Sequence, residues 1–366
     1  MTYDIGFIGY GLMGTAHANA LARLPMFFPD APASNRHIIA GRDEPALEAA
    51  ADRYGFDRTT TDWREAVADA DVVYNLTPNT LHPEPSIEAL ETDTHVLCEK
   101  PLAATLEGAD RMVAAAETTD AVAGCAFNYR YVPALVAIRN LVADGVIGDI
   151  RHFRGQYLQD FQADPEDPWI WRNDADVAGY GTVGDVGAHT LDLARWLVGD
   201  IDRVAGTLTR FADERPVPET GDRSPVTTDD SYGALLEFAN GAQGVLEGSR
   251  MATGHKNTNA IELIGSKGAV RYDVERFNEF ELQREHDRGF QRISATESSD
   301  PYMDAWWPAG HGIGWEHTFV HENYEFLSAI DEGSSYAPDF ADAYAVQEVV
   351  DAIVESDRSG TWVTVP

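Results

Sequence analysis

The stretch YDIGFIGYGLMG, residues 3–14, decides the fold of the first half of the chain. Its first half is mostly apolar and rich in β-prone residues, which predicts a buried strand. The strand runs directly into Gly9, Gly11 and Gly14, spaced as G-x-G-x-x-G, and a helical stretch follows. A strand, a glycine loop and a helix in this order predict a dinucleotide-binding unit.

The three glycines have separate tasks in such a unit. Gly9 permits the tight turn, Gly11 lets the backbone approach a pyrophosphate, and Gly14 allows close packing of the helix. The helix also begins with backbone N–H groups that can bind the anion. We therefore expect cofactor contacts from the whole loop, Gly9, Tyr10, Gly11, Leu12, Met13 and Gly14.

Beyond this stretch, the first 126 residues alternate between short apolar runs and amphipathic helical stretches. This alternation is typical of a parallel sheet with helices on both faces. The strand-like runs lie at residues 3–8, 37–40, 71–76, 95–98 and 121–127. The pattern predicts an α/β Rossmann domain, a doubly wound parallel sheet, over residues 1–126.

The pattern changes over residues 127–366, where long alternating runs predict an α+β domain with a large, open and mainly antiparallel sheet. Asn240-Gly241 and Lys267-Gly268 fall between such runs and predict hairpin turns with a positive φ. The strand-like runs lie at 150–161, 204–211, 231–238, 243–248 and 259–264, and the helical stretches at 133–143, 187–197, 316–330 and 340–357. We expect two domains, with the C-terminal helix free to pack back on the first.

The charge of the chain limits its partners. Asp and Glu number 61 against 27 Lys and Arg, a formal net charge of −34. Such a charge repels phosphate backbones and anionic lipids, so we expect neither nucleic-acid nor membrane partners. No apolar run is long enough to span a membrane, and the first residues lack the pattern of a secretory signal, which predicts a cytoplasmic location. Cys98 and Cys125 supply neither a disulfide framework nor a zinc site.

The kind of basic residue is also informative, because only three are lysine and the others are arginine. An acidic, lysine-poor surface suits molar salt, since a Debye length of about 3 Å at about 1 M salt screens repulsion among carboxylates. The composition favours a protein from a halophile. An acidic protein from a mesophile is the alternative.

The residues after the second strand select the cofactor. An Asp or Glu there hydrogen-bonds the ribose 2′-hydroxyl of NAD, but this sequence reads Ile39-Ala40-Gly41-Arg42-Asp43. Gly41 stands at the expected acid position and Arg42 is suited to a 2′-phosphate, so NADP is favoured. NAD is the alternative, because a shift of one residue in the strand boundary places the Asp43 carboxylate at the ribose.

Two further strands end in polar residues that we expect beside the cofactor, because ligands bind at the carboxyl ends of strands in doubly wound sheets. The motif CEKP, residues 98–101, ends the run 95–98. Lys100 is one of only three lysines, and its compact ammonium is suited to hold a hydroxyl beside the nicotinamide. The run 71–76 ends in the same way. The cofactor contacts expected at these two strand ends are Thr77, Pro78, Asn79, His82, Glu99 and Lys100.

An acid–base pair opens the helical stretch 187–197. The sequence GDVGAHTLD, residues 184–192, places Asp185 and His189 four residues apart, on one face if the helix has begun by Asp185. A carboxylate beside an imidazole supports a base that takes a hydroxyl proton near neutral pH. We therefore expect Lys100, Asp185 and His189 to be catalytic.

Three histidines offer a competing reading. His317 and His321 have helical spacing and His311 lies nearby, a combination that could recruit a metal ion. The sequence fixes no carboxylate or cysteine partner for them, so we predict no metal site.

In this order and at these distances, the glycine loop, Glu99-Lys100-Pro101 and Asp185-x-x-x-His189 resemble the glucose-fructose oxidoreductase, inositol dehydrogenase and rhizopine catabolism (Gfo/Idh/MocA) family. The resemblance covers nearly the whole chain. It implies a Rossmann domain joined to an open sheet that serves partly for oligomerisation, in a homo-oligomer such as a dimer or tetramer. It also implies an NAD(P)-dependent dehydrogenase acting on a CH–OH group of a sugar or cyclitol. Lys100 would then polarise the hydroxyl, His189 would be the base, and Asp185 would position substrate or tune the other two.

Further segments, among them AFNYR at 126–130 and YLQD at 157–160, resemble a subgroup that oxidises C3 of anhydro-sugars such as levoglucosan, or of glucosides. Aromatic faces and amides suit a ring with an apolar face and a rim of hydroxyls. The sugar contacts that this resemblance implies are Lys100, Tyr129, Gln159, Trp171, Arg172, Asp185 and His189. The alternatives are an inositol 2-dehydrogenase, an aldose 1-dehydrogenase and, from another class, a non-catalytic dinucleotide-binding sensor. The Gly41-Arg42 pair departs from the NAD specificity of the subgroup.

Overall fold

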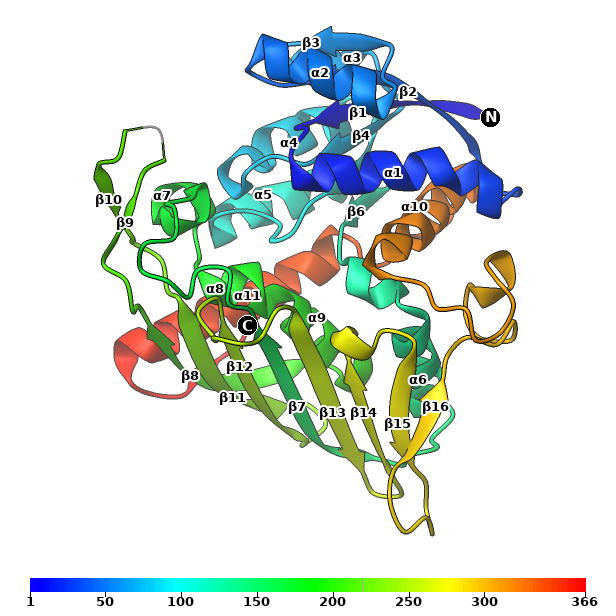
Figure 1. The fold of residues 1–366 in the computed structure, drawn as a ribbon, viewed down its shortest axis with the longest axis vertical. Coiled ribbons are helices and arrows are strands. Elements are labelled where there is room, and N and C mark those ends of the chain that lie inside the picture. Colours follow the sequence, from blue (N-terminus) through cyan, green and yellow to red (C-terminus); the bar gives the residue numbers. More distant parts are fainter. Residues whose placement is uncertain (219) are drawn as a thin grey trace. The chain divides into compact units, whose positions relative to one another are not determined.

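The structure is a computed structural model that describes every residue except residue 219 (Figure 1). The chain divides into two compact units. Unit 1 comprises Met1–Tyr131 and Gly314–Tyr344, and unit 2 comprises Val132–Ile313 and Ala345–Pro366.

Unit 1 is built on a six-stranded sheet whose strands are all parallel, in the order β3-β2-β1-β4-β5-β6. The strands are β1 (Thr2–Ile8), β2 (Ala33–Ala40), β3 (Arg58–Thr60), β4 (Val72–Asn75), β5 (His95–Cys98) and β6 (Ala123–Cys125). The reversal of order at β1 and β4 is that of a doubly wound sheet. The predicted Rossmann fold is confirmed.

Helices cover this sheet. Helix α1 packs against α2 and α10, while α4 packs against both α3 and α5, and Figure 1 shows α1 and α10 side by side. The helices of unit 1 are α1 (Leu12–Phe27), α2 (Glu44–Tyr54), α3 (Trp63–Ala68), α4 (Pro83–Glu91), α5 (Leu106–Ala116) and α10 (Trp315–Glu332), with short 3-10 turns η1 (Asn79–Leu81) and η2 (Asn128–Tyr131). Thus α10, close to the end of the chain, completes the first unit.

Unit 2 is built on a nine-stranded sheet in the order β16-β15-β14-β13-β7-β12-β11-β8-β17. Neighbouring strands are antiparallel except β7 and β12, which are parallel. The strands are β7 (Ile150–Leu158), β8 (Ile201–Thr209), β11 (Ser231–Phe238), β12 (Gln243–Ser249), β13 (Thr258–Gly265), β14 (Ala269–Asp273), β15 (Glu279–Gln283), β16 (Gln291–Ser294) and β17 (Val363–Thr364), and β9 (Glu214–Pro216) pairs with β10 (Arg223–Pro225) in a separate hairpin. The predicted large, mainly antiparallel sheet is confirmed.

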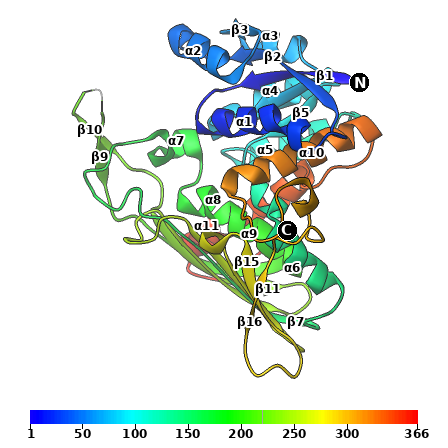
Figure 2. The same cartoon turned by 45° about the vertical axis from the view of Figure 1, so that its right-hand side comes forward.

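One face of this sheet carries helices, as the turned view in Figure 2 also shows. Helix α9 packs on β7 and β12, and a Cβ atom at Gly155 would lie 2.4 Å from the Thr190 side chain, so the helix approaches the strand closely. The helices of unit 2 are α6 (Pro133–Ala143), α7 (Ala175–Ala178), α8 (Thr182–Asp185), α9 (Gly187–Val198) and most of α11 (Phe340–Ser359), with 3-10 turns η3 (Trp171–Asn173), η4 (Val274–Arg276) and η5 (Met303–Ala305).

The two predicted glycine turns differ. Gly241, between β11 and β12, has a φ of 85°, as expected. The hairpin turn predicted at Lys267-Gly268 joins β13 and β14, but its predicted positive φ was wrong, because Gly268 is not among the residues with positive φ. Instead a Cβ atom at Gly268 would lie 2.3 Å from the carbonyl oxygen of Gln283, so glycine is needed there for close approach to the neighbouring strand.

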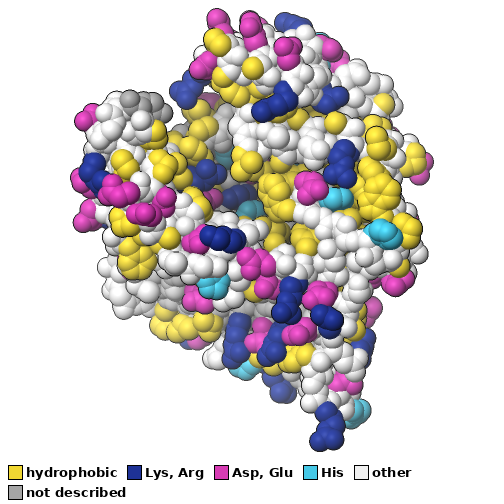
Figure 3. Space-filling model, viewed as in Figure 1, with side chains coloured by type: hydrophobic (Ala, Val, Ile, Leu, Met, Phe, Trp, Pro, Cys, Tyr) yellow, Lys and Arg dark blue, Asp and Glu magenta, His cyan; other side chains and the backbone are white. Residues whose placement is uncertain are grey.

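The other face of the sheet is open within unit 2. A broad hollow of about 1190 Å³ lies over it, and Leu235 and Val245 are each 49% exposed there. Arg154 and Arg271 form ion pairs with Glu262 on this face, and Figure 3 shows such charges intermingled over the lower strands. No helix in the described part of the chain is long and apolar enough to cross a bilayer.

Candidate active site

The glycine loop of unit 1 has the geometry of an anion cradle. Gly9 has a φ of 104°, and a Cβ atom there would lie 2.7 Å from the carbonyl oxygen of Leu76. Gly11 caps α1 without any side-chain hydrogen bond, and a Cβ atom on Gly11 would meet no protein atom within 4 Å. At Gly14 a Cβ atom would approach the carbonyl oxygen of Gly9 to 3.3 Å. The loop therefore leaves the first N–H groups of α1 open to a pyrophosphate, and these residues fit a dinucleotide.

The rest of the loop supports this surface. Tyr54 donates a hydrogen bond of 2.9 Å to the carbonyl oxygen of Tyr10, which ties the loop to α2. Leu12 is 74% exposed at the start of α1, and Met13 is half-buried behind it.

The ring of Tyr10 packs against the segment after β2 and leaves no room for a side chain at position 41. A Cβ atom at Gly41 would lie 2.1 Å from the Tyr10 ring, so a side chain at the expected acid position would collide with the loop. The Asp43 carboxylate accepts a hydrogen bond of 3.1 Å from the Ala46 N–H and caps α2. Arg42 is exposed between them.

The loop after β4 is tied to the CEKP loop by His82. This side chain is fully buried, and its Nδ1 lies 3.0 Å from the carbonyl oxygen of Pro101 while its Nε2 lies 2.9 Å from that of Thr77. Burial lowers the pKa of His82, against the effect of these carbonyl contacts. Its ring thus joins two loop backbones and is not exposed toward a ligand.

The other residues of the loop after β4 are also fixed by hydrogen bonds or burial within unit 1. Thr77 donates a hydrogen bond of 2.6 Å to the side-chain oxygen of Asn75, whose amide donates to the His82 carbonyl at 2.9 Å. Pro78 precedes the turn η1, and Asn79 within it is 7% exposed.

Glu99 is 5% exposed and contacts the protein on both carboxylate oxygens. Its Oε1 lies 3.4 Å from Nε2 of His17 on α1, and its Oε2 lies 3.3 Å from the Lys100 backbone N–H. Glu99 therefore links the nucleotide-binding helix to the backbone of Lys100. The Lys100–Pro101 peptide bond is cis.

In unit 2, Asp185 and His189 lie on two successive helices and not on one. Helix α8 ends at Asp185, and α9 begins at Gly187. Asp185 Oδ2 lies 3.3 Å from Nε of Arg172, an ion pair that the sequence did not predict. His189 is 8% exposed, and its ring centroid lies 6.1 Å from that of Tyr157 on β7.

A group of amides lies at the end of β7. Gln159 donates a hydrogen bond of 2.9 Å to the side-chain oxygen of Asn257, which also accepts one of 2.9 Å from the Tyr157 hydroxyl. Asn259, on the neighbouring strand opposite Tyr157, is 1% exposed, and neither atom of its amide has a hydrogen-bond partner among the described residues. Sequence reasoning missed both residues, because the side chains bonded to Asn257 and the strand that pairs with Asn259 lie about 100 positions away along the chain.

The remaining predicted sugar contacts are divided between the units. The Arg172 guanidinium lies 4.3 Å from the centre of the Trp171 ring, in unit 2. Tyr129 is 2% exposed within η2 of unit 1, and Lys100 belongs to unit 1 as well.

The histidines considered for a metal ion have other contacts. His321 is fully buried with Nδ1 at 2.9 Å from the carbonyl oxygen of Tyr131, and burial lowers its pKa to about 3. His317 Nδ1 accepts a hydrogen bond of 3.1 Å from the Gly314 N–H. Among the residues described, no cluster of three or more His, Cys, Asp or Glu side chains could hold a metal ion.

Comparison with known proteins agrees with this geometry. Residues 3–127 match a family model described as an oxidoreductase family with an NAD-binding Rossmann fold, and residues 135–271 match the GFO/IDH/MocA C-terminal domain. The chain belongs to the Gfo/Idh/MocA oxidoreductase family. The fold of the family accounts for both units, and the first carries the NAD-binding loop.

Two relatives and one solved structure show the range of likeness within the family. The chain is 40% identical to a levoglucosan dehydrogenase from Pseudarthrobacter phenanthrenivorans, over 99% of this chain and 98% of the relative. It is 28% identical to an inositol 2-dehydrogenase from Rhizobium meliloti, over 97% of both chains. A structure of levoglucosan dehydrogenase in complex with NADH and levoglucosan superposes with a TM-score of 0.97 at 40% identity, covering all of both chains. The chain is thus similar over its whole length to sugar dehydrogenases.

Proposed function

We propose that this protein oxidises one secondary hydroxyl of a cyclic sugar with NAD(P), and that C3 of levoglucosan or a related glucoside is the carbon oxidised. The observation that carries the proposal is the full-length likeness to a levoglucosan dehydrogenase, together with the open glycine cradle in unit 1. Nicotinamide, when bound, accepts the hydride from that carbon. The protein supplies positioning and proton transfer.

Lys100, Asp185 and His189 are the proposed catalytic residues. The Lys100 ammonium donates a hydrogen bond to the reacting hydroxyl and stabilises negative charge that develops on its oxygen. His189 takes the hydroxyl proton as the carbon is oxidised. Asp185 is held by Arg172, so its position relative to the start of α9 is fixed.

The sugar contacts are proposed from the residues around β7 and η3. The amide of Gln159 and the neighbouring Asn257 offer donors and acceptors to ring hydroxyls, while the flat face of Trp171 suits the apolar face of a sugar. Arg172 lies over the Trp171 ring and pairs with Asp185, so it joins the aromatic face to the catalytic carboxylate. Tyr129 is the proposed contact from unit 1.

For the cofactor we propose NADP as preferred and NAD as the alternative. Arg42 is exposed after β2, where a guanidinium can pair with a 2′-phosphate. The Asp43 carboxylate caps α2, and a side chain at position 41 would collide with Tyr10. The similar levoglucosan dehydrogenase was solved with NADH, which keeps NAD in the proposal.

We also propose that the protein is a homo-oligomer that uses the open face of its nine-stranded sheet. Leu235 and Val245 are large apolar side chains in the middle of that face, each half exposed. Burying them against a second copy would remove apolar surface from water.

A panel assay tests the proposed function. Reduction of NADP and NAD is followed by the absorbance of the reduced nicotinamide, with levoglucosan, glucosides, free aldoses and myo-inositol as substrates. Turnover highest with levoglucosan or a glucoside supports the proposal. Turnover highest with myo-inositol or an aldose selects the alternative dehydrogenases, and cofactor binding without any turnover selects a sensor.

A further inference from the structure

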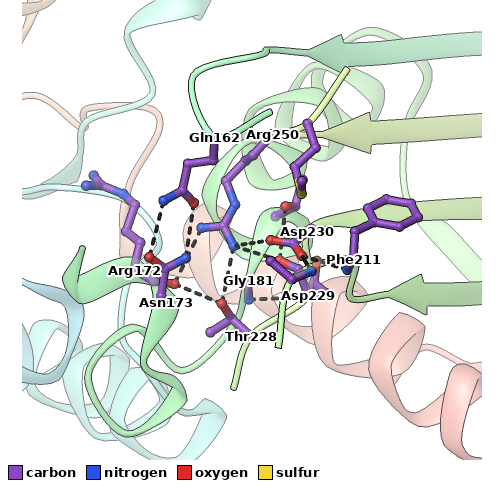
Figure 4. Close-up of polar contacts among 12 residues, drawn as sticks. Gln162, Arg172, Asn173, Gly181, Phe211, Thr228, Asp229, Asp230 and Arg250 are labelled. Carbon is purple, nitrogen blue, oxygen red and sulfur yellow. Dashed lines mark hydrogen bonds and ion pairs between the residues drawn. The ribbon is translucent and has the colours of Figure 1, made fainter. Parts of the chain in front are cut away.

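A buried polar cluster in unit 2 contacts the backbone of Arg172, the partner of Asp185 in the ion pair (Figure 4). Its centre is the segment Thr228–Asp230, just before β11, with the side chain of Arg250 from the end of β12. Arg250 is fully buried, and its Nη2 donates hydrogen bonds of 2.7 Å to the carbonyl oxygen of Asp229 and 3.2 Å to the Thr228 hydroxyl. A buried guanidinium is tolerated only with such partners, so this cluster has a fixed geometry.

Asp229 accepts hydrogen bonds from the backbone N–H groups of three consecutive residues, 181–183, at the start of α8. Its carboxylate accepts hydrogen bonds from the N–H of Gly181 at 3.0 Å and of Val183 at 3.1 Å. Its carbonyl oxygen accepts from the N–H and the hydroxyl of Thr182, each at 3.1 Å. One residue therefore holds three consecutive residues at the start of the helix that ends in Asp185.

Gly181 shows how close this contact is. A Cβ atom there would lie 2.3 Å from Oδ1 and 2.4 Å from the carbonyl oxygen of Asp229. The φ of Gly181 is −86°, not positive, and the close approach to Asp229 leaves no room for a side chain.

The same cluster holds the other partner of the ion pair. The carbonyl oxygen of Arg172 accepts a hydrogen bond of 3.0 Å from the Thr228 hydroxyl and one of 3.4 Å from Nη1 of Arg250. The backbone of Arg172 and the backbone leading to Asp185 are thus both fixed by Thr228, Asp229 and Arg250. The ion pair of 3.3 Å therefore joins two side chains whose backbones contact the same cluster.

We propose that Asp229 is a positioning residue for sugar oxidation, which sets Asp185 against Arg172 and fixes the start of α9, the helix that carries His189. The inference rests on the proposed function, in which Asp185 and His189 act on the sugar. A displacement of about 1 Å at such groups lowers a rate by about 100-fold.

Asp230, the next residue along the chain, provides a matched control for a substitution of Asp229. It is fully buried, its Oδ1 lies 3.9 Å from Arg250, and its Oδ2 accepts hydrogen bonds from the N–H of Phe211 at 2.8 Å and Ala212 at 3.2 Å. Asp229 and Asp230 thus hold different backbones beside one guanidinium. Only the backbone held by Asp229 leads to the proposed catalytic residues.

The test compares D229N with D230N in the full chain. The side-chain amide has only one oxygen and cannot replace both carboxylate oxygens as acceptors for the N–H groups of Gly181 and Val183. We therefore expect D229N to lower kcat for the sugar by about 100-fold. KM for the nicotinamide cofactor stays unchanged, because its loop lies in unit 1. We expect D230N to keep kcat within about threefold, although both variants lose a buried carboxylate. Equal losses of kcat in D229N and D230N would overturn the inference.

Hydrogen exchange separates this inference from the proposed function. We expect the amides of residues 181–185 to lose protection in D229N and to keep it in D230N. If these amides stay protected in D229N, the inference is overturned whatever the activities are. If the wild type oxidises no sugar, the proposed function fails while the exchange experiment still decides whether Asp229 holds this segment.

A second pair of variants applies if D229N does not fold. G181A drives a Cβ atom against Asp229, whereas G289A, in an exposed loop, places one where no protein atom lies within 4 Å. We expect G181A to lower kcat with cofactor KM unchanged and G289A to behave as the wild type. Wild-type kcat in G181A would contradict the inference.

Discussion

The Nε2 atom of His17 lies 3.4 Å from the Oε1 atom of Glu99, and both side chains are buried. The amide of Asn323 lies 3.3 Å from the other ring nitrogen of His17, while its oxygen accepts a hydrogen bond from Tyr74. The amide nitrogen can only donate, so His17 accepts on Nδ1 and donates from Nε2 to Glu99. This relationship fixes Glu99, and through it the backbone of Lys100.

Replacing Glu99 by Gln should weaken this arrangement. The new amide would turn a donor toward either the His17 ring or the Lys100 N–H, and leave one of them without an acceptor. We expect Glu99→Gln to lower the free energy of unfolding by about 1–3 kcal/mol, measured by urea denaturation. Glu117→Gln, at an exposed position, should stay within about 0.5 kcal/mol of the wild type. Equal stability of the two variants would contradict the role of Glu99.

A second buried carboxyl, that of Glu322, predicts a pH dependence of stability. Its oxygens have no hydrogen-bond partner among the described residues, and burial, with the Glu99 carboxyl next, raises its pKa well above the ordinary value. With the folded pKa above the unfolded one, the contribution of Glu322 is fully present below about pH 4 and is lost as pH rises. We expect Glu322→Gln to match the wild type in Tm near pH 4 and to exceed it increasingly up to pH 8.

Glu332→Gln is the control for this experiment, because Glu332 is exposed at the end of the same helix, α10. The Tm of Glu332→Gln should equal that of the wild type at every pH. A Tm difference between Glu322→Gln and the wild type that does not grow with pH would contradict a protonated Glu322 in the folded protein.

Removing the Lys100 ammonium should affect catalysis and not cofactor binding. We expect Lys100→Ala to lower kcat by about 10²–10⁴-fold, because a group that holds and polarises the hydroxyl is lost. The dissociation constant of the cofactor, measured by fluorescence titration, should change little because the glycine loop is intact. Lys267→Ala, in an exposed turn, is the control. Unchanged turnover in Lys100→Ala would rule out its proposed role.

Arg42 should decide the preference between NADP and NAD. Loss of a charge-assisted hydrogen bond to a phosphate costs about 1.5–3 kcal/mol, or about 10- to 100-fold in kcat/KM. We expect Arg42→Ala to lower kcat/KM for NADP by this factor and to leave that for NAD nearly unchanged. A ratio of the two constants that does not move in Arg42→Ala would instead favour NAD, and Asp43→Asn would then be the informative variant.

The fold was predictable where one sequence pattern indicated both a strand or helix and the elements that follow it in the chain. The strand before Gly9 and the alternation after it predicted the parallel sheet, and α6 begins and ends at the predicted residues, 133 and 143. Strand β3 was missed because it has three residues, none of them fully buried, and so carries no apolar signal. The hairpin at Gly268 was predicted but its φ was not, because a glycine that needs a positive φ and one that needs close approach look alike in sequence.

The candidate site was predictable only in part, since sequence shows residue types and spacing but not long-range contacts. Spacing singled out Asp185 and His189, but gave no sign of the helix break between them or of Arg172 as the partner of Asp185. Asp229 holds a segment 46 to 48 positions earlier in the chain by accepting from backbone N–H groups, which do not depend on the side chains of that segment. Such contacts leave no local pattern in the sequence.

The most direct test of the central claim is to follow the hydrogen on C3 of the sugar. Levoglucosan deuterated at C3 is incubated with NADP, and separately with NAD, in about 2 M KCl, which screens the repulsion among the carboxylates of the surface. We predict that deuterium appears in the reduced cofactor and that the sugar product carries a ketone at C3. Reduced cofactor that contains no deuterium, or no reduction at all with cofactor bound, would contradict oxidation of a sugar at C3 by this protein.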